Sequence, residues 1–129
     1  MIDADVIIKG EKGTFDLRGW IAAQTESLEL AAITVAELWH GVERATVTYR
    51  ARRAEFIRTI LDGVAVVPYT QATAFEHARI WAAAEASGKT MGPYDAIVAA
   101  SVIERGSTLA TFNRRHFENV HGLKLIEPK

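Results

Sequence analysis

Short apolar runs alternate along the chain with longer segments of helical periodicity. The runs are bounded by polar or turn-forming residues and predict strands at Leu28–Ile33, Val64–Val67, Ser107–Thr111 and Leu123–Ile126. Met1–Asp3 has room only for the end of a further strand. Strands that alternate with helices are typical of a mostly parallel sheet covered on both faces. We therefore expect an α/β fold.

Apolar residues at spacings of three and four predict the helices between these runs. We expect a short helical turn at Asp5–Lys9 with Asp5 as its cap, and longer helices over Thr14–Gln24, from Thr34 through Val42, over Tyr49–Leu61, over Thr70–Ser87 and from Pro93 onward.

Two of these helices carry further expectations. In Thr70–Ser87 we expect an inward face formed by Phe75, Ala78, Trp81 and Ala82, with Gly88 ending the helix. The helix from Pro93 is apolar nearly all round, so it should lie in the middle of the domain.

Composition limits the class of protein. A chain of 129 residues with 49% hydrophobic and 24% charged residues indicates one ordinary globular domain, here spanning 1–129. The absence of cysteine excludes disulfides, thiolate metal sites and a cysteine nucleophile, and is compatible with the cytoplasm. We expect no membrane span and no signal peptide, because neither a run of 18 apolar residues nor a basic and apolar leader occurs. The net charge of −1 means that nucleic acid would have to be bound by a local patch.

Four oxygen-bearing side chains stand at the ends of predicted elements. Asp3 ends the first strand, Glu37 and Asp95 lie in the first turns of two helices, and Asn113 follows a late strand. In an open α/β sheet, the strand C-termini and the following helix N-termini share one edge, where ligands bind. We expect these side chains to converge there.

Purely structural interpretations of the same residues remain open. Thr34-Val35-Ala36-Glu37 has the form of a capping box, in which Thr34 and Glu37 satisfy each other's backbone donors. An acid such as Asp95 in a first turn is favoured by the helix dipole, by roughly 0.3–1 kcal/mol.

Convergence would favour a bound cation. Carboxylates about 5 Å apart repel by a few kcal/mol per pair even at an effective dielectric near 20. Such a cluster is stable only if it is protonated or holds a cation, and oxygen ligands suit Mg²⁺ or Mn²⁺. A metal held in this way activates water and neutralises charge on a phosphodiester, which indicates hydrolysis of a nucleic-acid backbone.

Other chemistries find less support. The four histidines have no zinc-pair spacing, and no serine lies in a Gly-x-Ser-x-Gly elbow, although His116 flanks the predicted site. Gly88-Lys89-Thr90 resembles the end of a P-loop, but Ala83 stands where the first glycine is required. A phosphoacceptor receiver domain would need an aspartate after the third strand and a lysine after the fifth, and neither is present.

Four blocks of the sequence resemble, in order and spacing, the motif blocks of PIN-domain ribonucleases, and above all the VapC toxins of toxin–antitoxin pairs. The blocks are Ile2–Ile8, Ile33–Val42, Gly92–Ala100 and Thr111–Phe117, and they span nearly the whole chain. The resemblance implies a three-layer α/β/α fold, an acidic Mg²⁺ or Mn²⁺ site, and endonucleolytic cleavage of RNA that leaves a 5′ phosphate. It also implies a homodimer and a small VapB-type antitoxin that blocks the site.

The resemblance assigns roles to individual residues. It makes Asp3, Glu37 and Asp95 the metal-binding acids, places Asn113 where the family has a fourth Asp or Asn, and makes Thr111 a supporting hydroxyl.

The sequence departs from the family pattern at two positions. Asp5 stands where the family usually has Asn, Ser or Thr, so it either adds a fourth carboxylate or caps the turn. Asn113 offers a carbonyl oxygen without charge, and the adjacent Arg114 and Arg115 are candidate RNA contacts. The alternative function is a PIN-like domain that binds RNA or a partner with little turnover.

Overall fold

Short parallel strands form the centre of the computed structural model, which describes residues 1–129. β1 (Glu29–Ala31) pairs with β2 (Ala65–Val67), and β3 (Thr108–Ala110) pairs with β4 (Lys124–Ile126), both in parallel. The predicted strands are confirmed, although each is shorter than its apolar run.

The N-terminal residues join the two strand pairs. The Ile2 amide donates to the Glu29 carbonyl at 2.9 Å, and Ile2 forms a parallel bridge with Ala110. The Asp3 amide in turn donates to the Ala110 carbonyl at 3.0 Å. The hydrogen-bonded order is therefore β2, β1, residues 1–3, β3, β4, and Asp3 leaves the sheet at its centre.

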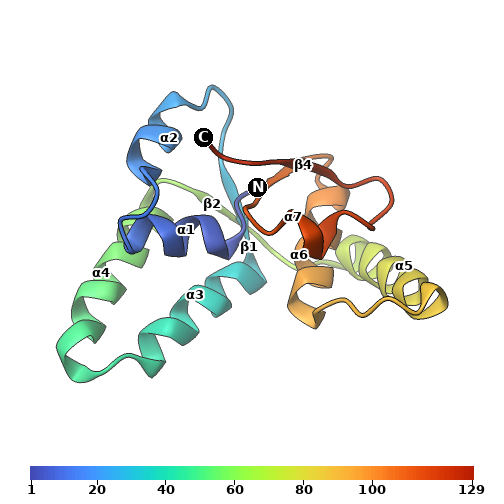
Figure 1. Cartoon of the computed structure of the whole chain (residues 1–129), viewed down its shortest axis with the longest axis horizontal. Helices are drawn as coiled ribbons and strands as arrows, with labels where there is room; N and C mark the ends of the chain where they lie inside the picture. The colour runs from blue at the N-terminus through green and yellow to red at the C-terminus, as the bar shows by residue number, and fades with distance from the viewer.

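Helices cover both sides of these strands (Figure 1). One side carries α1 (Ala4–Glu11), α2 (Leu17–Ala23), α3 (Ala32–Arg44) and α4 (Val47–Asp62), and the other carries α5 (Gln71–Ser87), α6 (Pro93–Glu104) and α7 (Arg114–Phe117). The expected three-layer α/β/α arrangement is confirmed. No helix has the length and apolar character needed to cross a bilayer.

Alternate strand residues feed two separate cores. Leu30 and Ala110 pack in the core with α1–α4, whereas Ala31 and Leu109 pack with α5 and α6. Successive residues of a strand point to opposite faces, so each short strand contributes to both layers.

The starts of the first two helices differ from prediction. Asp3, not Asp5, caps α1, because its Oδ1 accepts a hydrogen bond from the Ala4 amide at 2.9 Å. α2 begins at Leu17 instead of Thr14, and Asp16 caps it by accepting from the Gly19 amide at 3.1 Å.

The capping-box interpretation of Thr34 and Glu37 is wrong. β1 runs directly into α3, whose N-cap is Ala31 and makes no side-chain capping bond. Thr34 is therefore already inside the helix and fully buried. The local explanation for Glu37 is removed with it.

α5 has the predicted bounds but the opposite buried face. Thr70 caps it, and Gly88 ends it with φ of 68°, a left-handed conformation that glycine adopts without strain. Phe75 and Trp81, predicted inward, are 70% and 59% exposed, and Ala78 and Ala82 are exposed as well. The buried residues of this helix are Thr73 and Ile80.

α6 is confirmed as the central helix. Pro93 occupies its first turn after the N-cap Gly92, so the missing proline N–H costs nothing. Val98, Ala99 and Ala100 are fully buried. This packing holds the first turn of α6, with Asp95, beside the strand ends.

Candidate functional site

Asp3 is fixed at the centre of the sheet edge. It is only 5% exposed, and both its carboxylate oxygens have partners: Oδ1 accepts from the Ala4 amide at 2.9 Å and Oδ2 accepts from the Thr111 hydroxyl at 2.8 Å. Thr111 follows β3, so two neighbouring strand ends hold this one side chain. The orientation of Asp3 is therefore set before any ligand binds.

Asp5 braces the loop that follows β3. Its Oδ2 accepts from the Phe112 amide at 3.0 Å, and the Thr111 hydroxyl lies 3.4 Å from its Oδ1. The backbone N–H of Asn113 donates to the Thr111 Oγ1 at 3.0 Å. Asp5 is thus neither the predicted cap nor isolated from the acids; it ties α1 to the loop that carries Thr111 and Asn113.

Glu37 carries a buried oxygen that lacks a partner. Its Oε1 has no hydrogen bond, and neither has the Thr34 Oγ1 one helical turn away on α3. A buried polar atom without a partner costs about 1–3 kcal/mol, and native proteins tolerate it where an ion, a water or a function explains it. Glu37 is thus available to a ligand.

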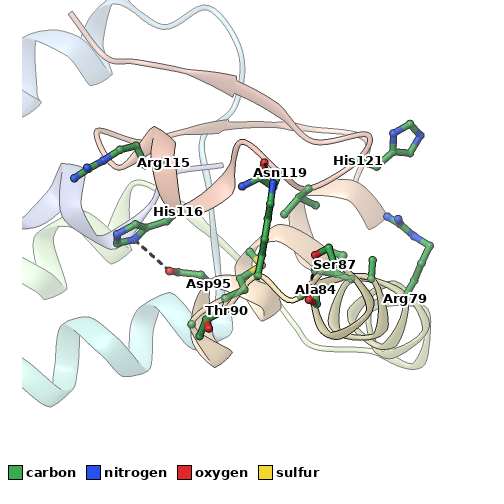
Figure 2. Close-up of a pocket in the computed structure, with 15 residues that line it drawn as sticks. Arg79, Ala84, Ser87, Thr90, Asp95, Arg115, His116, Asn119 and His121 are labelled. Atoms are coloured by element: carbon green, nitrogen blue, oxygen red, sulfur yellow. Dashed lines mark hydrogen bonds and ion pairs between the residues drawn. The ribbon is translucent and has the colours of Figure 1, made fainter.

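Asp95 faces away from its own helix toward α7. Its Oδ2 lies 3.3 Å from the Nδ1 of His116, the ion pair drawn as a dashed line in Figure 2. A Cβ at Gly92 would approach this Oδ2 to 3.1 Å, so glycine leaves room for the carboxylate. The sequence indicated that His116 flanks the predicted site, but not that it contacts Asp95.

The acids raise one another's pKa values. Burial raises the pKa of Asp3 to about 6, against the hydrogen bond from Thr111, and the charges of Asp5 and Asp95 add to the rise. Burial followed by repulsion from Asp3 and Asp95 raises the pKa of Glu37 to about 7. Burial also raises the pKa of Asp95, although His116 counteracts it. These carboxylates therefore influence one another electrostatically, whereas their convergence on one ion stays a prediction.

The arrangement and the chemistry of the possible ligands differ in how well they suit a metal ion. No three of the acidic and histidine side chains stand in positions from which they could hold one ion together. One of the acids, Asp95, is paired with His116 instead. The donor chemistry fits nonetheless, because the unpartnered Glu37 Oε1 and the mutual repulsion of Asp3, Glu37 and Asp95 are both relieved by a hard divalent cation. Rotation of the carboxylate side chains, without movement of the backbone, would let these oxygens turn toward a shared ion.

The remaining predicted residues surround this centre. Asn113 is exposed and precedes α7, and its side chain makes no capping bond. Arg114 and Arg115 are exposed in the first turn of α7. Only Arg115 lines the cavity of about 570 Å³ that begins at Asp95.

Comparison with known proteins identifies the family. The family model described as PIN domain matches residues 1–123. The VapC ribonuclease Y4jK of Sinorhizobium fredii is 32% identical over 137 aligned positions, which cover 99% of this chain and 96% of that protein. The chain belongs to the VapC ribonucleases.

Other VapC proteins show the same relationship. The tRNA(fMet)-specific endonuclease VapC of Shigella flexneri is 30% identical, with 74% of this chain and 70% of that protein covered. The DNA-bound VapBC structure from Salmonella typhimurium contains a chain that superposes with a TM-score of 0.91 at 25% identity, covering 98% of this VapC chain and 96% of its own. The family and the fold implied by the four sequence blocks are confirmed, whereas the individual residue roles and the homodimer stay predictions.

Proposed function

We propose that this VapC chain is a Mg²⁺- or Mn²⁺-dependent endoribonuclease that hydrolyses RNA phosphodiester bonds as the toxin of a VapBC pair. The observation that carries the proposal is the buried, unpartnered Oε1 of Glu37, which stands within electrostatic reach of Asp3 and Asp95. Such an arrangement is unfavourable without a cation and becomes favourable with one.

The residues divide into ligands and supports. Asp3, Glu37 and Asp95 would hold the metal, which when bound lowers the pKa of a coordinated water and neutralises charge on the phosphodiester. Thr111 keeps Asp3 in one orientation through the 2.8 Å hydrogen bond. Asp5 accepts a hydrogen bond from the backbone N–H of Phe112 and so positions the loop that carries Asn113. From this loop, the side-chain carbonyl oxygen of Asn113 is offered to a ligand or to the substrate.

The partners follow from the family. VapBC assemblies are among the structures that share this fold, so we propose a small VapB-type antitoxin that blocks the acids and thereby inhibits cleavage. A cationic side chain of the antitoxin would be attracted by the same excess of negative charge that attracts a metal. We also propose a homodimer that acts in the cytoplasm, where its RNA substrates are found.

A cleavage assay with a matched pair of variants tests the proposal. We expect the purified chain to cut RNA, with tRNA(fMet) in the panel because the Shigella flexneri relative is specific for it, when Mg²⁺ or Mn²⁺ is present and not after chelation. Asp95→Asn should reduce the cleavage rate by more than about 100-fold. This exceeds the loss of about 10- to 100-fold that follows when a residue that only supports a metal ligand is replaced. Glu104→Gln, on the exposed last turn of the same helix, makes the same charge change and should leave the rate unaltered.

The assay also separates the proposal from its alternative. A folded Asp95→Asn variant that cleaves as fast as the parent would remove the case for this metal site. A parent that binds RNA and antitoxin but cuts nothing with either metal would instead indicate a binding domain.

A further inference from the structure

A second concave region begins where the acidic site ends. The cavity of about 570 Å³ lies between the C-terminal half of α5, the segment 88–92, the start of α6, and α7 with the loop that follows it. Asp95 and His116 stand at one end, and Arg79 and His121 at the other (Figure 2). Asp95 thus belongs both to the acidic site and to this cavity.

The cavity has the opposite charge to the acidic site. Its rim includes Arg79, Lys89 and Arg115 together with His116 and His121, while Asp95 is the only acid that lines it. In a chain whose net charge is −1, this is a local concentration of positive charge. The sequence showed only that binding of nucleic acid would need such a patch.

Two of the cationic groups of the cavity, those of Arg79 and Lys89, retain free donors. Arg79 forms an ion pair with Glu76 at 2.9 Å, which leaves part of its five-donor guanidinium available, and its side chain is 44% exposed. Lys89 donates one hydrogen bond to Asn119 at 3.1 Å, and its ammonium carries two further donors. Both side chains can therefore contact an anion without losing their present partners.

Size and lining suit a nucleotide. The volume falls within the range of about 300–1,000 Å³ found for ligand pockets. Apolar residues also line the cavity, Ile80, Ala84 and Val120 among them. The cationic side chains can donate hydrogen bonds to phosphate oxygens, and the apolar residues can pack against a base.

We propose that this cavity is a subsite for single-stranded RNA, which binds the nucleotide and backbone phosphate on one side of the bond that is cut. The inference rests on the proposed function, because it takes the acidic site as the place of cleavage. A strand whose reacting phosphate lies at the acids can leave past Asp95, and the cavity offers it a positively charged path from that residue to Arg79 and Lys89. The two phosphate-binding regions are thus continuous. One would bind phosphate through a metal, and the other would bind it through cationic side chains.

The test measures RNA binding separately from cleavage. The probe is a fluorescently labelled, single-stranded ten-nucleotide RNA, titrated in Ca²⁺ at several salt concentrations and checked on a gel for integrity. Arg79→Ala combined with Lys89→Ala removes two phosphate contacts. The slope of log affinity against log salt should then fall by about 1.4, and the affinity near 0.1 M salt should fall by about 5- to 25-fold.

Two control proteins make the result specific. Arg18→Ala combined with Arg52→Ala removes the same charge from exposed positions on α2 and α4, across the sheet from the cavity, and should leave both quantities unchanged. Arg79→Lys combined with Lys89→Arg keeps both charges and should retain most of the parent affinity. In cleavage assays the alanine pair should raise KM while kcat stays within about twofold, because neither residue touches the reacting phosphate.

The outcomes separate the two proposals. An alanine pair that matches the parent in affinity and salt slope overturns the subsite, even if the protein cleaves RNA. A parent that binds RNA with the expected loss in the alanine pair, yet never cuts it, overturns the proposed nuclease and supports the cavity as an RNA-binding site.

Discussion

Asp95 separates two regions of opposite charge that share a single edge of the sheet. On one side, burial and then repulsion from neighbouring acids raise the pKa of Asp3 to about 6 and that of Glu37 to about 7. On the other side, the cavity presents Arg79 and Lys89 and no further acid. A nearly neutral chain thus carries a site that favours cations beside a site that favours anions. Binding of a phosphodiester together with a metal ion requires both.

The two regions also differ in rigidity of support. Asp3 and Asp5 are held by backbone amides and by Thr111 at strand ends, whereas Arg79 and Lys89 reach from an exposed helix and the segment after it. We therefore expect changes at the acids to alter the rate of cleavage, and changes at the cavity to alter RNA affinity.

The largest effect should come from Glu37→Gln. The variant loses a proposed metal ligand, so cleavage should fall by more than about 100-fold, beyond the loss of a ligand's support. It also loses a buried, repelled charge, so its metal-free thermal midpoint at pH 8 should rise by a few degrees. Glu55→Gln, exposed on α4, should change neither quantity. Unchanged cleavage in Glu37→Gln would break the contrast between the regions.

Thr111→Val should have the next largest effect. The variant removes the hydroxyl that orients Asp3, and a lost support of a metal ligand lowers metal affinity or activity by about 10–100-fold. Thr111→Ser should retain most of the activity. Metal titration of the cleavage rate measures this, and a valine variant with the metal dependence of the parent would show that Asp3 needs no such support.

The stability of the metal-free protein should decrease as the pH rises. The folded pKa values of Asp3 and Glu37, about 6 and 7, exceed their ordinary values of 3.8 and 4.5. The folded chain therefore binds more protons than the unfolded chain between roughly pH 4 and 7, and the free energy of unfolding from these groups falls across that window. Thermal midpoints measured across it with EDTA should decline, and Mg²⁺ or Mn²⁺ should reduce the decline at its upper end. A midpoint that rises steadily with pH would contradict the crowding of the acids.

Asp5→Asn should have the smallest effect. Its amide oxygen can still accept the Phe112 N–H, so the loop keeps its position and cleavage should change by less than about 10-fold. Steady-state kinetics would measure this. A loss of more than about 100-fold would instead place Asp5 among the metal ligands.

The central helix was predictable from the sequence. Pro93 marks the start of α6, and its apolar character on every side requires burial, so Asp95 had to lie at the edge of the sheet. The start of α3 was not predictable, because β1 passes into the helix without a loop and Thr34 and Glu37 imitate a capping box. The residue at which a helix begins depends on how far the preceding strand pairs with its neighbours. The local sequence does not contain this information.

The order of residue types alone determined the alternation of strands and helices, and with it the expectation that Asp3, Glu37 and Asp95 meet at one edge. Only the tertiary structure decided which face of α5 is buried. Alanines occur on every side of this helix, so no face is clearly more hydrophobic than the others. That choice leaves Arg79 on the rim of the cavity, together with Lys89 and His121. Periodicity records burial only where the faces of an element differ in polarity, and contacts between distant segments arise from packing that no local pattern contains.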